Sequence, residues 1–172
     1  RCLAWSCDDT VYLSPLLFGT HIVLNIRQSI AVLAAFSFVL PLGLYPLFDL
    51  DEGAFSEATR EMLASGNYLT TYLQGELRFD KPIFIYWLQA ISSSVFGLYA
   101  WSLRLPSALA TLTWLFFLVR FVQIHISRHA ALACGILFVA SLHINIIGKA
   151  AISDAVLNVC IASSMLSFCH AI

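Results

Sequence analysis

The strongest constraint on this chain is an apolar run, residues 26–48, in which Arg27 is the only charged residue. A run of this length can cross a bilayer, because a spanning helix needs about 20 apolar residues. Three carboxylates follow within four positions, at Asp49, Asp51 and Glu52. Carboxylates so close to lipid are energetically costly, so they indicate a functional site at the membrane surface.

The composition also indicates a membrane protein. Hydrophobic residues make up 60% of the chain and charged residues 11%, and the mean hydropathy is +0.84. A soluble domain carries about 25% charged residues. The net charge of −1 provides no basic field, so no nucleic-acid partner is expected. Because the chain begins with Arg1 and ends at Ile172 inside an apolar run, we expect a fragment of a longer polytopic protein, inactive alone.

Residues 1–25 are left unassigned, because they lack a clear positive n-region and cleavage site of a signal peptide. Residues 26–172 are expected to form the N-terminal part of a transmembrane domain. The five cysteines show no CxxC pair and no Cys/His ligand spacing, so a zinc site built on cysteine is not expected. The chain has no glycine-rich phosphate loop and no HExxH motif.

Four apolar runs are candidate membrane-spanning helices, and a fifth is truncated: residues 27–48, 82–98, 105–126, 130–148 and 155–172. The first is expected to kink near Pro41 and Gly43. Run 82–98 is at the short limit for a span. If it spans, Asp51 and Asp154 lie on opposite sides of the membrane; if it lies flat or re-enters, they share one side. We favour the second interpretation.

The polar segment after the first run predicts an amphipathic helix over residues 53–64. Phe55, Ala58 and Met62 recur at helical spacing on one face, and Gly66 is a plausible stop. A helix of this kind can lie in the membrane interface with its apolar face toward the lipid. It would then belong to the first outer loop.

Asp51 and Glu52 have two interpretations. Acidic residues favour the first turn of a helix, where they cap it and complement its dipole. A carboxylate at the membrane surface can also act as a general base toward a hydroxyl, and a second one beside it can raise its pKa or help to hold a cation. We favour the functional interpretation for this pair.

Two lysines and a further acid are candidate site residues. Lys81 precedes a predicted helix start, where its ammonium and the free N–H groups would favour a phosphate; alternatively it is an interfacial lysine paired with Asp80. Lys149 and Asp154 lie between two apolar runs, where they either mark the membrane edge and cap a helix or take part in the site. Arg104 is interpreted as an interfacial residue at the start of a span.

Single polar residues in apolar surroundings are expected to form hydrogen bonds between helices rather than to bind ligands. They are Gln123, His143 and Asn145.

Four motifs together resemble a known family. They are Asp51-Glu52, SEATREMLASGN at residues 56–67, RFDKPIFIYWL at residues 78–88 and RLPSAL at residues 104–109. In this order they resemble the opening third of the bacterial aminoarabinose transferase and protein mannosyltransferase superfamily. The resemblance covers about residues 44–154.

The resemblance implies an all-α integral membrane fold, a polytopic helical bundle of the GT-C type with amphipathic juxtamembrane helices in the first outer loop. It implies an inverting glycosyltransferase of the inner membrane that takes a sugar from a polyprenyl phosphate on the periplasmic, outer face. The acceptor would be a lipid, a protein or a glycan. No cofactor is assigned, and a divalent metal ion stays an open alternative.

The resemblance also assigns site residues. Asp51 matches an acid taken as catalytic, Lys81 a lysine that contacts the lipid phosphate, and Asp154 a second acid. With the local pattern, we predict Asp51, Glu52 and Asp154 as catalytic residues and Lys81 and Lys149 as ligands of the donor phosphate.

Two departures from the aminoarabinose enzymes put the sugar and the acceptor in doubt. Ala54 replaces an arginine that typically follows the acidic pair, and Ile83 replaces a second proline. A different class, a non-catalytic lipid carrier or transporter subunit, is the alternative. Transporters place their charges at the midplane of the membrane, whereas these charges cluster at its edge. A third interpretation is that this piece does not fold stably by itself.

Overall fold

The computed structural model describes residues 26–44, 46–47, 51–79 and 81–171, so Asp49 and the unassigned segment 1–25 lie outside the described residues. Nearly every element is helical. In chain order they are α1 (Ile26–Val39), η1 (Leu40–Gly43), α2 (Asp51–Ser65), β1 (Tyr72–Leu73), β2 (Glu76–Leu77), α3 (Phe84–Phe96), α4 (Ala100–His125), α5 (Arg128–Ala140), α6 (Leu142–Lys149) and α7 (Asp154–Ala171).

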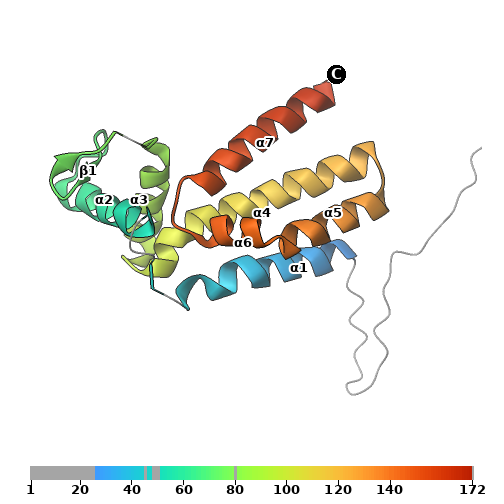
Figure 1. Ribbon diagram of the computed structural model, residues 1–172, viewed down its shortest axis with the longest axis horizontal. Coiled ribbons are helices and arrows are strands. Elements are labelled where there is room, and N and C mark those ends of the chain that lie inside the picture. The colour runs from blue at the N-terminus through green and yellow to red at the C-terminus, as the bar shows by residue number, and fades with distance from the viewer. Residues whose placement is uncertain (1–25, 45, 48–50, 80, 172) are drawn as a thin grey trace, which may run out of the picture.

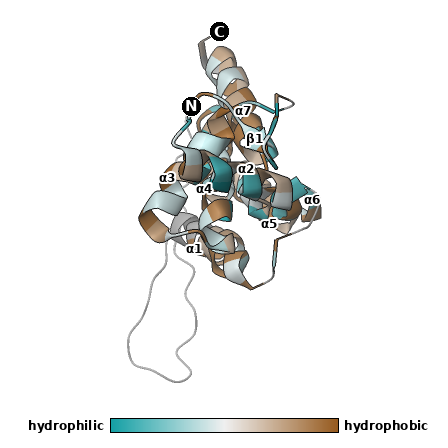
Figure 2. Cartoon of the chain, turned by 90° about the vertical axis from the view of Figure 1, so that its left-hand side faces the viewer, coloured by the Kyte–Doolittle hydropathy of each residue, from teal (hydrophilic) through white to brown (hydrophobic). Residues whose placement is uncertain are grey.

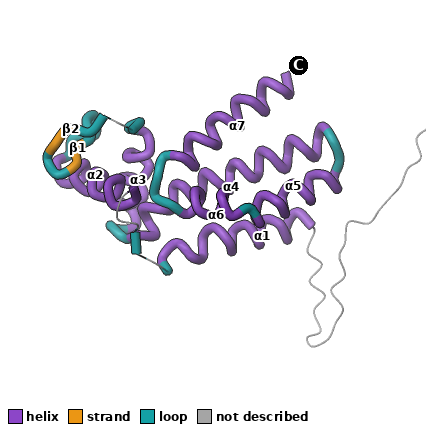
Figure 3. The backbone as a smooth tube through the Cα atoms, in the orientation of Figure 1, coloured by secondary structure: helices purple, strands orange, loops and turns teal. Residues whose placement is uncertain are grey.

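Helix α4 is the central element. It contacts α1, α3, α5, α6 and α7, and its 26 residues extend over about 39 Å, enough to cross the hydrocarbon core of a bilayer. Figure 1 shows α1, α5 and α6 along its length, while α2, α3 and the hairpin gather at one end. The turn between α4 and α5 lies at the opposite end from the hairpin (Figure 3).

The expected spans are only partly present as single long helices. Among the described residues, Ala100–His125 is the one helix long and apolar enough to cross a membrane by itself, and α5 with α6 qualifies only as a pair bent by 64°. The predicted first span changes to a 3-10 helix at Leu40–Gly43, where Pro41 was expected to kink it. Residues 82–98 form only the 13-residue α3, about 20 Å long and too short to span.

The break between α5 and α6 was not predicted, because neither proline nor glycine marks it. Asn145 compensates for the broken backbone ladder, since its Nδ2 donates to the carbonyls of Val139, at 2.6 Å, and Ser141, at 2.9 Å. Its Oδ1 accepts a hydrogen bond from Ser37 Oγ of α1 at 3.1 Å. The prediction that Asn145 links helices is therefore confirmed.

Helix α2 begins at Asp51 and ends where Gly66 adopts a φ of 69°, as its stop signal predicted. Its apolar stripe does not face lipid. Phe55 and Met62 pack against Ile85 and Tyr86 of α3, and the Phe55 and Tyr86 rings stack with centroids 5.3 Å apart. Figure 2 shows hydrophilic residues around α2, whereas α7 is largely hydrophobic.

Pro106 lies inside α4 without breaking it. Because proline has no N–H, the carbonyl of Ser102 one turn earlier would lose its helical partner. Ser92 Oγ of α3 donates to that carbonyl at 2.6 Å. The Ser102 carbonyl that Pro106 leaves without a helical partner therefore links α4 to α3, at the end of the bundle where α2 begins.

Candidate active site

The two acids that open α2 point in different directions. Successive helical residues are rotated by about 100°, so neighbours cannot share one face. Glu52 is buried, at 1% exposure, and Asp51 is exposed. Both lie in the first turn, where the helix dipole stabilises a carboxylate. The two carboxylates therefore differ in accessibility, because only Asp51 of this pair is open to a ligand from solvent.

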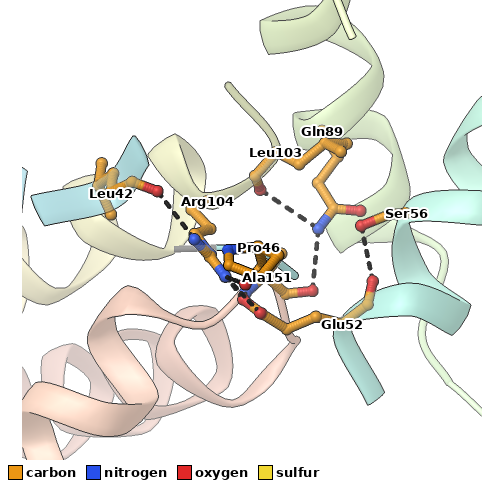
Figure 4. A network of polar contacts seen from close by, with 8 residues as sticks. All are labelled: Leu42, Pro46, Glu52, Ser56, Gln89, Leu103, Arg104 and Ala151. Carbon is orange, nitrogen blue, oxygen red and sulfur yellow. Dashed lines mark hydrogen bonds and ion pairs between the residues drawn. The ribbon is translucent and has the colours of Figure 1, made fainter. Parts of the chain in front are cut away.

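Glu52 forms a two-pronged ion pair with Arg104 of α4. Arg104 Nε donates to Glu52 Oε1 at 2.9 Å, and Nη2 donates to Oε2 at 2.7 Å. Paired donors that match both carboxylate oxygens make this the strong geometry for such a contact. Figure 4 shows the pair between α2 and α4.

Arg104 is not an interfacial residue, so that prediction was wrong. Its side chain is fully buried, and two further N–H groups donate to the carbonyls of Leu42, at 2.9 Å, and Pro46, at 2.8 Å. The sequence contained a signal for this inward orientation: Arg104, Ser107 and Thr111 recur at i, i+3 and i+7, which places them on one face of α4.

The same carboxylate holds the loop between α6 and α7, residues 150–153. The backbone N–H of Ala151 donates to Glu52 Oε1 at 2.6 Å. Ser107 Oγ of α4 donates to the carbonyl of Ile152 at 3.1 Å. The loop therefore lies against the first turn of α2, although 99 residues separate Glu52 from Ala151.

The two ends of this loop carry the remaining predicted residues of its segment. Asp154 is exposed and begins α7, and Ser153 Oγ lies 3.4 Å from its Oδ1. Lys149 ends α6 and is half-buried, with its ammonium 5.7 Å from the centre of the Phe38 ring. A cation at this distance from an aromatic face is attracted by the ring.

Lys81 is exposed and precedes α3, which begins at Phe84, with Ile83 as its cap, rather than at Pro82. The strand pair before it is fixed to α2 by Glu61, whose carboxylate accepts the backbone N–H groups of Gln74, at 2.6 Å, and Gly75, at 3.3 Å. Figure 3 shows this hairpin at the same end of the molecule as the α6–α7 loop.

The structure thus brings Glu52 together with the loop between Lys149 and Asp154, and it places Asp51 beside Glu52. Lys81 lies in a separate segment, between the hairpin and α3. Within the described part of the chain, no group of three His, Cys, Asp or Glu side chains is close enough to hold a metal ion.

Sequence reasoning missed Gln89 of α3 as part of this arrangement. It is fully buried, and its Nε2 donates to the carbonyl of Ala151 at 3.1 Å. Gln89, Ser92 and Ser93 are spaced as neighbours on one helical face, so this polar stripe could have indicated an inward orientation.

The chain is similar to known transferases in sequence, as a family model and two relatives show. The family model described as dolichyl-phosphate-mannose-protein mannosyltransferase matches residues 80–172. A protein of Wigglesworthia glossinidia brevipalpis named undecaprenyl phosphate-alpha-4-amino-4-deoxy-L-arabinose arabinosyl transferase is 34% identical over 147 residues, covering 84% of this chain and 26% of that protein. A protein of the same name from Aeromonas salmonicida (strain A449) is 32% identical over 132 residues, covering 76% of this chain and 24% of that protein.

Two solved structures are similar in fold. They are crystal structures of ArnT from Cupriavidus metallidurans, one in the apo state and one bound to undecaprenyl phosphate. Each superposes with a TM-score of 0.76 at 25% sequence identity, covering 80% of this chain and 26% of the solved chain. This chain therefore spans about a quarter of the length of these relatives.

Proposed function

Because the chain belongs to the dolichyl-phosphate-mannose-protein mannosyltransferase family, we propose that it forms part of an integral membrane glycosyltransferase that uses a sugar linked to a polyprenyl phosphate. The relatives named as arabinosyl transferases and the related structure bound to undecaprenyl phosphate support this donor class. The observation that carries the proposal is the contact between Glu52 and the Ala151 backbone, which brings the segments of Asp51 and Asp154 together.

Asp51 is proposed as the residue that faces the acceptor. It is exposed at the start of α2, whereas Glu52 is enclosed by Arg104 and Ala151. Glu52 was predicted together with Asp51 as catalytic. Its burial favours a positioning role, in which it orients α2 and the α6–α7 loop and does not contact substrate.

The reaction exchanges one bond at the sugar. The acceptor hydroxyl attacks the anomeric carbon, Asp51 takes or orients its proton, and the bond from that carbon to the phosphate oxygen breaks with inversion. The polyprenyl phosphate leaves with the bonding electrons. Lys81 and Lys149 are proposed to stabilise this leaving charge, since fixed cations act most strongly where charge develops. Asp154 is proposed to line the same site.

The acceptor and the sugar are proposed only as classes. The acceptor is a lipid, a protein or a glycan, and an acceptor phosphate would need no general base, so Asp51 would then orient it. Ala54 and Ile83 depart from the aminoarabinose pattern, so we do not assign that sugar.

The arrangement of the helices supports a proposed location. Since α3 is too short to span, we propose that α4 crosses the membrane and that the bent pair α5 and α6 returns to the end where α2 begins. We propose a multi-pass protein of the inner membrane whose α2 and α6–α7 loop face the periplasm. The first outer loop would then contain α2, the hairpin and α3.

The test is Asp51→Asn in the full-length enzyme that contains this segment. We expect transfer from a polyprenyl-phosphate-linked sugar to fall by about 10²- to 10⁴-fold, the range that a general base contributes. Insertion into the membrane should be unchanged, because Asp51 is exposed. Glu57→Gln, a change at a carboxylate farther along α2, is the matched control and should retain transfer. Normal turnover of Asp51→Asn would refute its catalytic assignment.

A further inference from the structure

The backbone of Ala151 is held from both sides by buried side chains of two different helices. Its N–H donates to Glu52 Oε1 of α2 at 2.6 Å, and its carbonyl accepts from Gln89 Nε2 of α3 at 3.1 Å. Ala151 itself is completely buried. Figure 4 shows both contacts converging on this one peptide, which lies between Lys149 and Asp154 in the chain.

The orientation of the Gln89 amide is determined by its neighbours. Nε2 faces two carbonyls, those of Ala151 at 3.1 Å and Leu103 at 3.4 Å, and carbonyls require a donor. Oε1 then faces Thr59 Oγ1 of α2 at 2.7 Å, whose single proton is shared between this oxygen and the Phe55 carbonyl at 2.9 Å. A flipped amide would place an oxygen against two oxygens, so only one orientation satisfies this set.

Gln89 therefore connects three other parts of the fold: Thr59 on α2, Leu103 on α4 and Ala151 in the α6–α7 loop. It is fully buried, so it does not contact a substrate. An amide is suited to this place because it accepts on one side and donates twice on the other, whereas a carboxylate would meet the two carbonyls without a donor.

We infer that Gln89 is a positioning residue for the transfer reaction. It holds the α6–α7 loop so that Asp154 and Lys149 keep their positions relative to Asp51. The inference rests on the proposed function. Glu52 fixes the N–H side of the Ala151 peptide and Gln89 fixes its carbonyl side, so loss of either contact lets the loop shift. A displacement of about 1 Å in a catalytic arrangement can cost about 100-fold in rate.

The test uses two nearly isosteric changes in the full-length enzyme, Gln89→Met and Thr59→Val. Gln89→Met removes the donor to Ala151, and Thr59→Val removes the hydroxyl that faces Gln89 Oε1. Thr113→Val is the matched control, because the Thr113 hydroxyl donates only to the Leu109 carbonyl of its own helix, at 2.8 Å, on an exposed face. Each variant is compared at equal amounts of folded protein, as judged by size-exclusion chromatography.

Two readouts are combined. The first is kcat/KM with the polyprenyl-phosphate-linked sugar, and the second is backbone hydrogen exchange in peptides that cover residues 150–156. We expect Gln89→Met to lower kcat/KM by about 100-fold and to speed exchange in the loop. Thr59→Val should cause smaller changes of both kinds, and Thr113→Val should change neither.

If Gln89 contributes only to the stability of the fold, the folded fraction of Gln89→Met should resemble the wild type in kcat/KM. If the folded fraction of Gln89→Met retains wild-type kcat/KM, or if exchange in the loop is unchanged, the inference is refuted. Absence of any transfer by the wild-type enzyme would refute the proposed function instead. The hydrogen-exchange result would then still decide whether Gln89 holds the loop.

Discussion

Replacement of Glu52 by glutamine tests the central contact of the fold. In Glu52→Gln one acceptor oxygen becomes an NH₂ donor, which must face donors of Arg104 or Ala151. The guanidinium keeps its hydrogen bonds to the carbonyls of Leu42 and Pro46, which are neutral acceptors, but loses the carboxylate of Glu52. Its charge stays buried without a counter-charge from Glu52.

The magnitude follows from this burial. Both side chains of the pair are almost inaccessible, with 1% of Arg104 and 2% of Glu52 exposed. Removal of one partner of a buried ion pair costs about 3–5 kcal/mol, because the remaining charge loses the counter-charge that offset its desolvation. We therefore expect the free energy of unfolding of Glu52→Gln to fall by that amount. Arg104→Met should cost a similar amount, and the double variant less than the sum of the two.

The assay is the free energy of unfolding of the full-length protein in mixed micelles, measured by titration with a denaturing detergent. Glu57→Gln is the control, because Glu57 forms an exposed pair with Arg60 on the same helix, with side-chain exposures of 39% and 54%. The hydrogen bond from Arg60 holds the pKa of Glu57 below its usual value. Exposed pairs contribute little, so no measurable change is expected.

A result in which Glu52→Gln and Glu57→Gln destabilise the protein equally would refute the reasoning. It would mean that water or another group compensates Arg104 when the carboxylate is lost. A double variant whose cost equals the sum of the single costs would likewise show that Glu52 and Arg104 are not coupled.

Three further predictions concern the surroundings of the site. Gly148→Ala should destabilise the protein by about 1–3 kcal/mol in the same assay, because the added Cβ would lie 2.7 Å from Thr111 Oγ1; unchanged stability would show that α6 can move away from α4. Single cysteines at Ala54 and Ser153, in a cysteine-free background, should both react with an impermeant thiol reagent from outside; labelling at only one would separate Asp51 and Asp154 across the membrane. Glu61→Ala should speed hydrogen exchange in the hairpin turn, because two backbone N–H groups lose their acceptor, and protection equal to wild type would contradict that contact.

The predictions that succeeded were those that depend on local pattern. Helical spacing indicated α2, and Gly66 indicated its end, because a positive φ is readily adopted by glycine. The expectation that Pro41 disturbs the first run was also met, since proline removes a helical N–H. The favoured interpretation, that residues 82–98 do not span, agrees with the 13-residue α3.

The sequence by itself determined that this chain is helical and apolar, and its motifs identified the family before any contact was known. Only the tertiary structure decided which polar residues face inward. The polar stripe of Arg104, Ser107 and Thr111 could have indicated an inward face of α4, but local sequence does not identify the groups that Arg104 meets there. The answer depends on a carboxylate 52 residues earlier, on α2, and on two carbonyls, those of Leu42 in η1 and of Pro46 after it. Such partners are brought together by packing, so the roles of Glu52, Arg104 and Gln89 appear only when the helices are assembled.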